Sequence, residues 1–108
     1  MTIRVDSVVA RWAREEGFAG NHNAVAGAKV FASSGCLACH GYLGGGSQPG
    51  DLTSIGRGGQ GVRFFEAYVA DPRKFGNRVM PRYGDLGPQR LHDLAVFLAA
   101  SRGRRGRR

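Results

Sequence analysis

The chain has few cysteines, few acidic residues and no long apolar run, and each shortage excludes a class of protein. Only two cysteines occur among 108 residues, whereas a structural zinc site needs four ligands and a second cysteine pair is missing. No Gly-Lys-Ser/Thr follows the glycine-rich stretch, which argues against a nucleotide site. No apolar run approaches the length of a membrane span, and the first four residues lead into no apolar core of a signal peptide. The length predicts one domain with a small core.

Acidic side chains are half as numerous as basic ones, with 8 Asp and Glu against 16 Lys and Arg and a net charge of +8. Five of these eight net charges belong to the last seven residues, which leaves about +3 for residues 1–101. We therefore predict that residues 102–108 form an Arg-rich, disordered and solvated tail. The alternatives are contact with anionic lipid, as in peripheral membrane association, or with an acidic partner. We expect no nucleic-acid partner.

Both cysteines lie in one short motif, Cys36-Leu37-Ala38-Cys39-His40. The C-x-x-C-H spacing is typical of c-type haem attachment. Two thiols at this spacing can each add to one vinyl group on the same porphyrin edge, and the next residue then lies under the iron. A thioredoxin-like dithiol would instead open a helix in a βαβ setting, which the surrounding sequence lacks. We predict one covalent haem c, bound through Cys36 and Cys39, with His40 as an axial ligand.

Apolar periodicity predicts helices and requires no strand. Four segments carry it: 3–16, about 24–33 with Asn23 as its cap, 61–70 and 88–101. Nine glycines between residues 41 and 61 predict a loop with at most one helical turn, at 51–53. The expected fold class is all-α, with short helices around one bound haem. We divide the chain into an amphipathic extension at 1–20, a haem-binding domain at 21–101 and the tail. The extension either packs back on the body or docks a partner subunit, and the sequence does not decide which.

The second axial ligand must come from the remaining Met and His residues, and Met80 is the strongest candidate. It lies in a loop 40 residues beyond His40, which is enough chain to reach the other face of the ring. Pro81 stiffens the backbone beside it. Iron with His and Met ligands has no open coordination position, and the thioether favours the ferrous state. These properties are those of an electron carrier, not of an enzyme.

Over residues 24–101 the chain resembles a class I c-type cytochrome. The resemblance is carried by Cys36–His40, Asp51-Leu52, the stretch from Asp71-Pro72-Arg73 to Met80-Pro81, and the final helix. It implies that His40 and Met80 are the axial ligands and that Gly27 and Phe31 pack across the last helix near Phe97. The Met80 segment is most similar to cytochrome domains carried by respiratory complexes.

The resemblance also suggests roles for Pro49 and Arg57. Many relatives have Gly-Pro-x-Leu, in which the proline carbonyl accepts the Nδ1–H of the proximal histidine. Here Pro49-Gly50-Asp51-Leu52 is one residue longer, and Pro49 is the candidate acceptor. Arg57 matches a position that often faces a haem propionate, the alternative being a solvated loop arginine.

The expected function is one-electron transfer between redox proteins, in the periplasm or on an extracytoplasmic membrane surface. Covalent haem attachment normally takes place outside the bacterial cytoplasm, so we expect a mature form or a domain of a longer protein. Basic residues around Met80 predict partners with acidic docking faces, such as subunits of a membrane respiratory complex. Two alternatives remain open at this point: a haem enzyme or gas sensor with a labile Met80, and an interaction domain that haem only stabilises.

Overall fold

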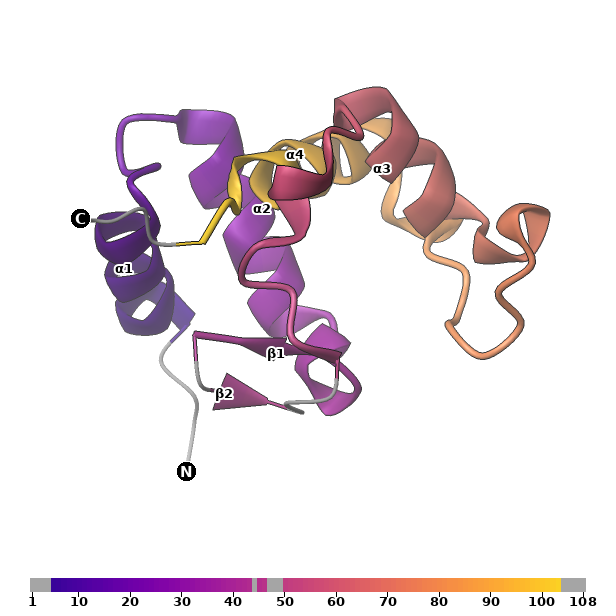
Figure 1. Ribbon diagram of the computed structural model, residues 1–108, viewed down its shortest axis with the longest axis horizontal. Helices are drawn as coiled ribbons and strands as arrows, with labels where there is room; N and C mark the ends of the chain where they lie inside the picture. Colours follow the sequence, from indigo (N-terminus) through magenta and orange to yellow (C-terminus); the bar gives the residue numbers. More distant parts are fainter. Residues whose placement is uncertain (1–4, 44, 47–49, 104–108) are drawn as a thin grey trace.

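The computed structural model describes residues 5–43, 45–46 and 50–103, and this part of the chain is mostly helical, as predicted (Figure 1). One small hairpin and short 3-10 turns join the helices; the turns include η1 (Cys36–Ala38), η3 (Ile55–Gly58), η4 (Pro72–Phe75) and η5 (Gly84–Leu86). The helices are α1 (Val5–Glu16), α2 (His22–Ser33), α3 (Val62–Ala70) and α4 (Pro88–Ala100). The predicted bounds of the third and fourth helices and the predicted end of the first are confirmed to within one residue, because an apolar stripe and a glycine or proline stop mark each of them. The predicted start of the first helix, at residue 3, lies outside the described residues.

Helices α2 and α4 cross at the centre of the molecule (Figure 1). A Cβ added to Gly27 of α2 would overlap the backbone carbonyl of Asp93 in α4, so only glycine permits this approach. Beside the crossing, the rings of Phe31 and Phe97 lie 5.3 Å apart and are almost fully buried. The packing that the resemblance implied is therefore present.

Helix α1 is part of the body. Its Trp12 is only 2% exposed and lies in an aromatic cluster, 4.6 Å from the ring of Tyr42 and 5.9 Å from that of Phe31. Burying a side chain as large as tryptophan stabilises the fold by several kcal/mol, on the order of 3–5 by comparison with truncation to alanine. The sequence left two hypotheses for the N-terminal extension, packing on the body or docking of a partner, and this packing supports the first.

The start of α2 differs from the prediction. The cap is Asn21, whose side chain accepts a hydrogen bond from the amide of Ala24, and the helix begins at His22. Asn23, the residue expected to cap the helix, donates instead to the carboxylate of Asp93 across the α2–α4 crossing, at 2.7 Å. Either asparagine could cap a helix on local grounds. Because the side chain of Asn23 is bonded to the buried Asp93 carboxylate on α4, Asn21 takes the position of the cap.

The glycine-rich loop contains a short strand pairing that the sequence did not require, within a fold that is otherwise helical, as the all-α class implies. Strands β1 (Gly41–Tyr42) and β2 (Gly45–Gly46) form an antiparallel hairpin. Residues 51–53, where a helical turn was predicted, are not helical, whereas a four-residue turn lies later, at η3 (Ile55–Gly58). Strands of two residues, made largely of glycine, leave no alternating apolar pattern that would reveal them.

The C-terminal end of the described chain is fastened to the body. The amide of Gly103 donates to the carbonyl of Thr53 and to the carboxylate of Glu16 in α1, both at 3.1 Å. Gly103, which the prediction placed in the tail, is therefore attached to the body, and residues 104–108 of the predicted tail lie outside the described part. No helix within the described residues is long and apolar enough to span a bilayer.

Candidate functional site

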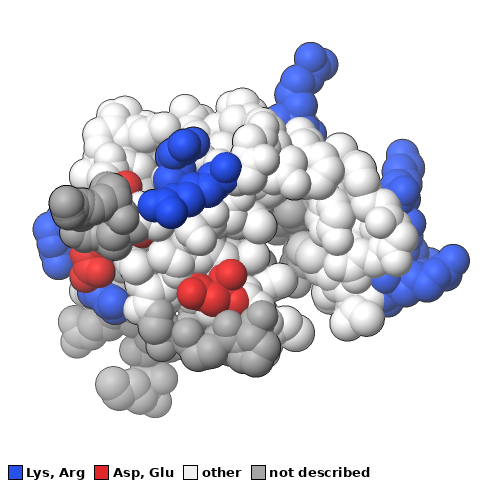
Figure 2. Space-filling view, in the orientation of Figure 1, with Lys and Arg blue, Asp and Glu red and all other residues white. Residues whose placement is uncertain are grey.

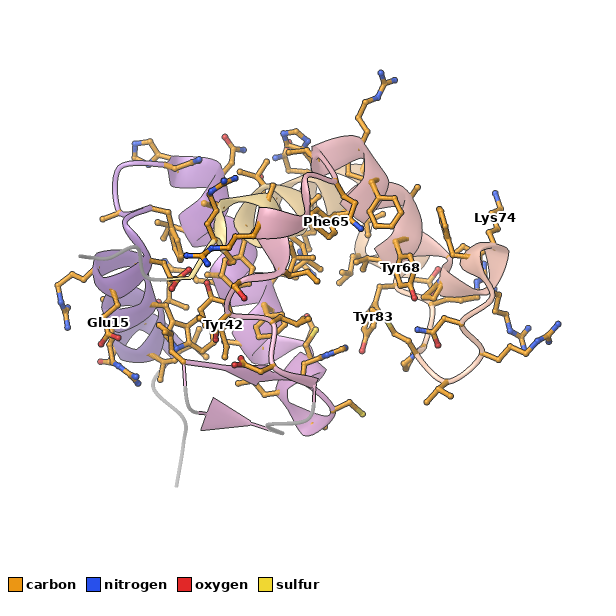
Figure 3. The ribbon with its side chains drawn as sticks, in the orientation of Figure 1. Glu15, Tyr42, Phe65, Tyr68, Lys74 and Tyr83 are labelled. Atoms are coloured by element: carbon orange, nitrogen blue, oxygen red, sulfur yellow. The ribbon has the colours of Figure 1, made fainter. Side chains whose placement is uncertain are left out.

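Three adjoining cavities share His40 and Met80 among their lining residues. Their volumes are about 300, 310 and 30 Å³. The lining of the first is mainly apolar or aromatic, with Leu52, Phe65 and Leu98 among its members, and the second extends along Cys36 and Cys39. Figure 3 shows Tyr68 and Tyr83 on the side formed by α3 and the loop after it, across from the hairpin. The fold thus brings Cys36, Cys39, His40 and Met80, four of the six predicted site residues, to one apolar space.

Cys36 is the first residue of the short turn η1 (Cys36–Ala38), which two residues separate from the end of α2, and Cys39 directly follows the turn. Gly35 allows the turn because its φ of 83° lies in the left-handed region, where an L side chain is strained. Both cysteines are free; Cys36 is buried and Cys39 is exposed. Burial raises the pKa of the Cys36 thiol above its ordinary value, although a hydrogen bond from the Tyr83 hydroxyl opposes this effect.

His40 is held by a backbone carbonyl. Its Nδ1 lies 2.9 Å from the carbonyl oxygen of Gly50, and since a carbonyl only accepts, Nδ1 carries the proton. The neutral ring then has its lone pair on Nε2, the nitrogen that can bind a metal. A Cβ on Gly50 would overlap the carbonyl of Cys39, so glycine lets this segment approach His40.

The predicted acceptor, Pro49, lies outside the described residues, and the carbonyl found beside His40 is that of the next residue. The signal for Gly50 was present in the sequence. Gly50 stands two residues before Leu52, the position that proline takes in the Gly-Pro-x-Leu pattern, so counting back from the leucine identifies it.

Met80 lies in a loop ordered by Asn77. The side-chain oxygen of Asn77 accepts the amides of Val79 and Met80, at 3.0 and 3.1 Å, and its amide nitrogen donates to the hydroxyl of Tyr68 at 2.9 Å. Sequence reasoning missed both residues. The Asn-x-x-Met spacing, which allows an asparagine to cap the following amides, was the available signal.

Arg57 is not brought to the cavities. It is exposed at the end of η3, and none of the three cavities has it as a lining residue among those described. Its guanidinium lies beside Gly103 instead, since a Cβ added there would be 3.6 Å from Nη2. The propionate contact suggested for Arg57 therefore stays a prediction, with the solvated loop arginine as its alternative.

Positive charge gathers beside the cavity that contains the cysteines. Arg73, Lys74, Arg78 and Arg82 are all exposed on the segment from η4 (Pro72–Phe75) to residue 82, at the right-hand end in Figures 1 and 2. Only Arg82 has a described acidic neighbour, Asp71, at 3.7 Å. Val79, in the same loop, is 91% exposed. The surface near Met80 is therefore an apolar tip surrounded by cations.

No protein-family model, curated protein or solved structure matches this chain. Within the described ranges, no group of three or more His, Cys, Asp or Glu side chains could hold a metal ion. A metal bound at His40 would therefore need donors from beyond these side chains. The chemistry of the cavity is the basis for a functional assignment.

Proposed function

We propose that this chain is a small cytochrome c domain that carries single electrons between redox proteins. One observation carries the proposal: two free thiols, an imidazole with its Nε2 lone pair available and a thioether all line the same mainly apolar space. A haem c fits this set of donors. It takes two thiols at its edge, a nitrogen and a sulfur ligand at the iron, and it supplies the four further donors that the described side chains lack.

Each residue has a distinct task in this proposal. Cys36 and Cys39 would hold the macrocycle covalently, and His40 and Met80 would be the protein ligands of its iron. The Gly50 carbonyl fixes the orientation of the His40 ring and raises its basicity. Apolar side chains from α3, α4 and the segment Gly50–Thr53, which we call the proximal loop, would exclude water from the space between the ligands; they include Leu52, Phe65, Val69, Leu94 and Leu98.

Bound haem supplies a one-electron iron couple. The chain's contribution would be to keep the side chains of His40 and Met80 in place in either oxidation state. Asn77 and Tyr68 hold the Met80 loop through three hydrogen bonds, and Gly50 holds His40 through one. A site whose ligands do not rearrange is suited to electron transfer and leaves no coordination position for a substrate.

The partners that fit this domain are redox proteins with an acidic docking face. The exposed cations of residues 73–82 lie beside the cavity with the two cysteines, so a partner that approaches there comes close to the edge of the cofactor. Complementary charge speeds encounter and orients the two proteins. Because covalent haem attachment takes place outside the bacterial cytoplasm, we place the protein in the periplasm or at an extracytoplasmic membrane surface.

The proposal is tested by producing the chain in a periplasm that contains haem-attachment enzymes. The purified protein is then denatured in acid and organic solvent, which removes haem that is not covalently bound. We expect haem absorbance to stay with the polypeptide, and to be lost from the double variant Cys36→Ala/Cys39→Ala. A wild-type chain that takes up no covalent haem under conditions that mature another c-type cytochrome would overturn the proposal.

A further inference from the structure

Leu43, the residue after β1, has a backbone conformation that its side chain disfavours. Its φ is 44°, which makes it the only non-glycine residue with positive φ among those described. In the left-handed region the Cβ of an L residue crowds the backbone. Such a residue persists where its surroundings hold it, and such residues often lie next to functional sites.

Both peptide groups of Leu43 are held by side chains from distant parts of the chain. Its amide donates to the hydroxyl of Thr53 at 2.8 Å. Its carbonyl accepts a hydrogen bond at 2.9 Å from Nη2 of Arg11, which comes from α1, 32 residues earlier. The strained residue is thus fixed between the proximal loop on one side and α1 on the other.

The Thr53 side of this arrangement leads directly to His40. The amide of Leu52 donates to the carbonyl of Gly41 at 2.8 Å, and the hydroxyl of Thr53 donates to Asp51 at 2.6 Å. These bonds fasten the segment Gly50–Thr53 along β1. The carbonyl of Gly50, at the start of the segment, accepts the Nδ1–H of His40.

The Arg11 side is anchored in the core. Trp12, the next residue, is 2% exposed and contacts Tyr42, which directly precedes Leu43. Nε of Arg11 donates to the carboxylate of Glu15 at 3.0 Å, so the guanidinium is oriented on the helix as well. Arg11 therefore reaches Leu43 from a rigid support.

We propose that Arg11 is a positioning residue for His40: by holding Leu43 it fixes the hairpin and, through Thr53, the loop whose Gly50 carbonyl orients the imidazole. The consequence for iron rests on the proposed function. Loss of the Gly50 bond makes the imidazole less basic and a weaker donor to ferric iron, so the midpoint potential rises.

The test compares Arg11→Ala with Arg14→Ala in the full, haem-loaded chain. Arg14 is an exposed arginine on the same helix, so both variants lose one positive charge. Proton NMR of the reduced protein measures hydrogen exchange at the amides of Leu43 and Leu52 and at the His40 Nδ1–H. We expect each to exchange about fivefold faster in Arg11→Ala, the effect of one net hydrogen bond, and to be unchanged in Arg14→Ala.

The midpoint potential distinguishes an effect of Arg11 on the orientation of His40 from an effect on the stability of the hairpin alone. Removal of a cation alone lowers the potential in both variants, whereas a loosened Gly50 bond raises it in Arg11→Ala only. We expect the potential of Arg11→Ala to lie above that of Arg14→Ala. Equal exchange rates in the two variants would overturn the proposal. It would also be overturned if Arg11→Ala accelerated exchange at the Leu43 and Leu52 amides but left the exchange of the His40 Nδ1–H and the midpoint potential unchanged.

A second background tests the role of the strained conformation. Glycine tolerates positive φ, so Leu43→Gly removes most of the strain that Arg11 holds. We expect Arg11→Ala to accelerate exchange less in the Leu43→Gly background than in the native one, and equal acceleration would contradict the mechanism. If the chain takes up no haem, the proposed function fails, and exchange at the hairpin and at His40 in the same samples still decides whether Arg11 positions the ring.

Discussion

In the haem-loaded protein that we propose, replacement of Asn77 by alanine should loosen the loop that holds Met80 at the iron. Asn77 makes three hydrogen bonds: it accepts the amides of Val79 and Met80 and donates to Tyr68. Each of these hydrogen bonds stabilises the closed loop by a net free energy of about 0.5–1.5 kcal/mol, and two of the three are part-buried. Their loss costs the closed loop about 2 kcal/mol, which raises the population of loops without bound Met80 about 30-fold.

Carbon monoxide binding to the reduced protein measures this opening. If the chain carries haem as proposed, the gas can bind the iron only when Met80 is displaced, so its slow binding rate reports the open population. We expect binding about 30-fold faster in Asn77→Ala than in the native protein. Asn77→Asp keeps the oxygen that accepts both loop amides and loses only the donor to Tyr68, so its rate should lie between the two.

Asn21→Ala is the matched control, because Asn21 caps α2 away from the Met80 loop. Loss of the cap should lower the free energy of unfolding by about 1 kcal/mol and leave carbon monoxide binding at the native rate. The reasoning is refuted if Asn77→Ala lowers overall stability while carbon monoxide binds no faster than in Asn21→Ala.

Three further predictions follow from the packing and the charges. Gly27→Ala should lower the free energy of unfolding by about 1–3 kcal/mol through its overlap with the α4 backbone, whereas Gly20→Ala, whose Cβ meets nothing within 4 Å, should be nearly neutral in denaturant titrations. Arg78→Glu with Arg82→Glu should slow electron transfer to an acidic partner at low salt and flatten its salt dependence; an unchanged dependence would place docking elsewhere. Burial raises the pKa of Tyr42 above its ordinary value of 10.0, so the neutral phenol contributes its full share of folding stability below about pH 10 and loses it at higher pH. Tyr42→Phe should remove this loss of stability at alkaline pH in thermal melts, and a loss that persists in the variant would point to another group.

Much of the helical framework could be predicted from sequence because it depends on local patterns. The stripe Val5, Val9 and Trp12 and the stop at Gly17 define α1, and Pro88 marks the start of α4. The predictions that were wrong concerned features that depend on contacts between distant segments. Asn21 and Asn23 are locally equivalent caps, and only the position of the Asp93 carboxylate distinguishes them.

The candidate site divides in the same way. Cys36, Cys39 and His40 are defined by a spacing of one turn, and the fold places them with Met80 as expected. The residues that orient these groups had weaker signals or none. Arg11 is separated by 32 residues from the carbonyl that it holds, and no local pattern predicts such a bond.

The central claim is tested most directly by the optical spectrum of the dithionite-reduced protein, recorded before and after carbon monoxide is added. The account predicts a low-spin c-type haem spectrum that carbon monoxide leaves unchanged over minutes, because His40 and Met80 occupy both axial positions. Rapid and complete carbon monoxide binding would contradict it, since Met80 would then not hold the iron, and the protein would be better explained as a haem enzyme or gas sensor.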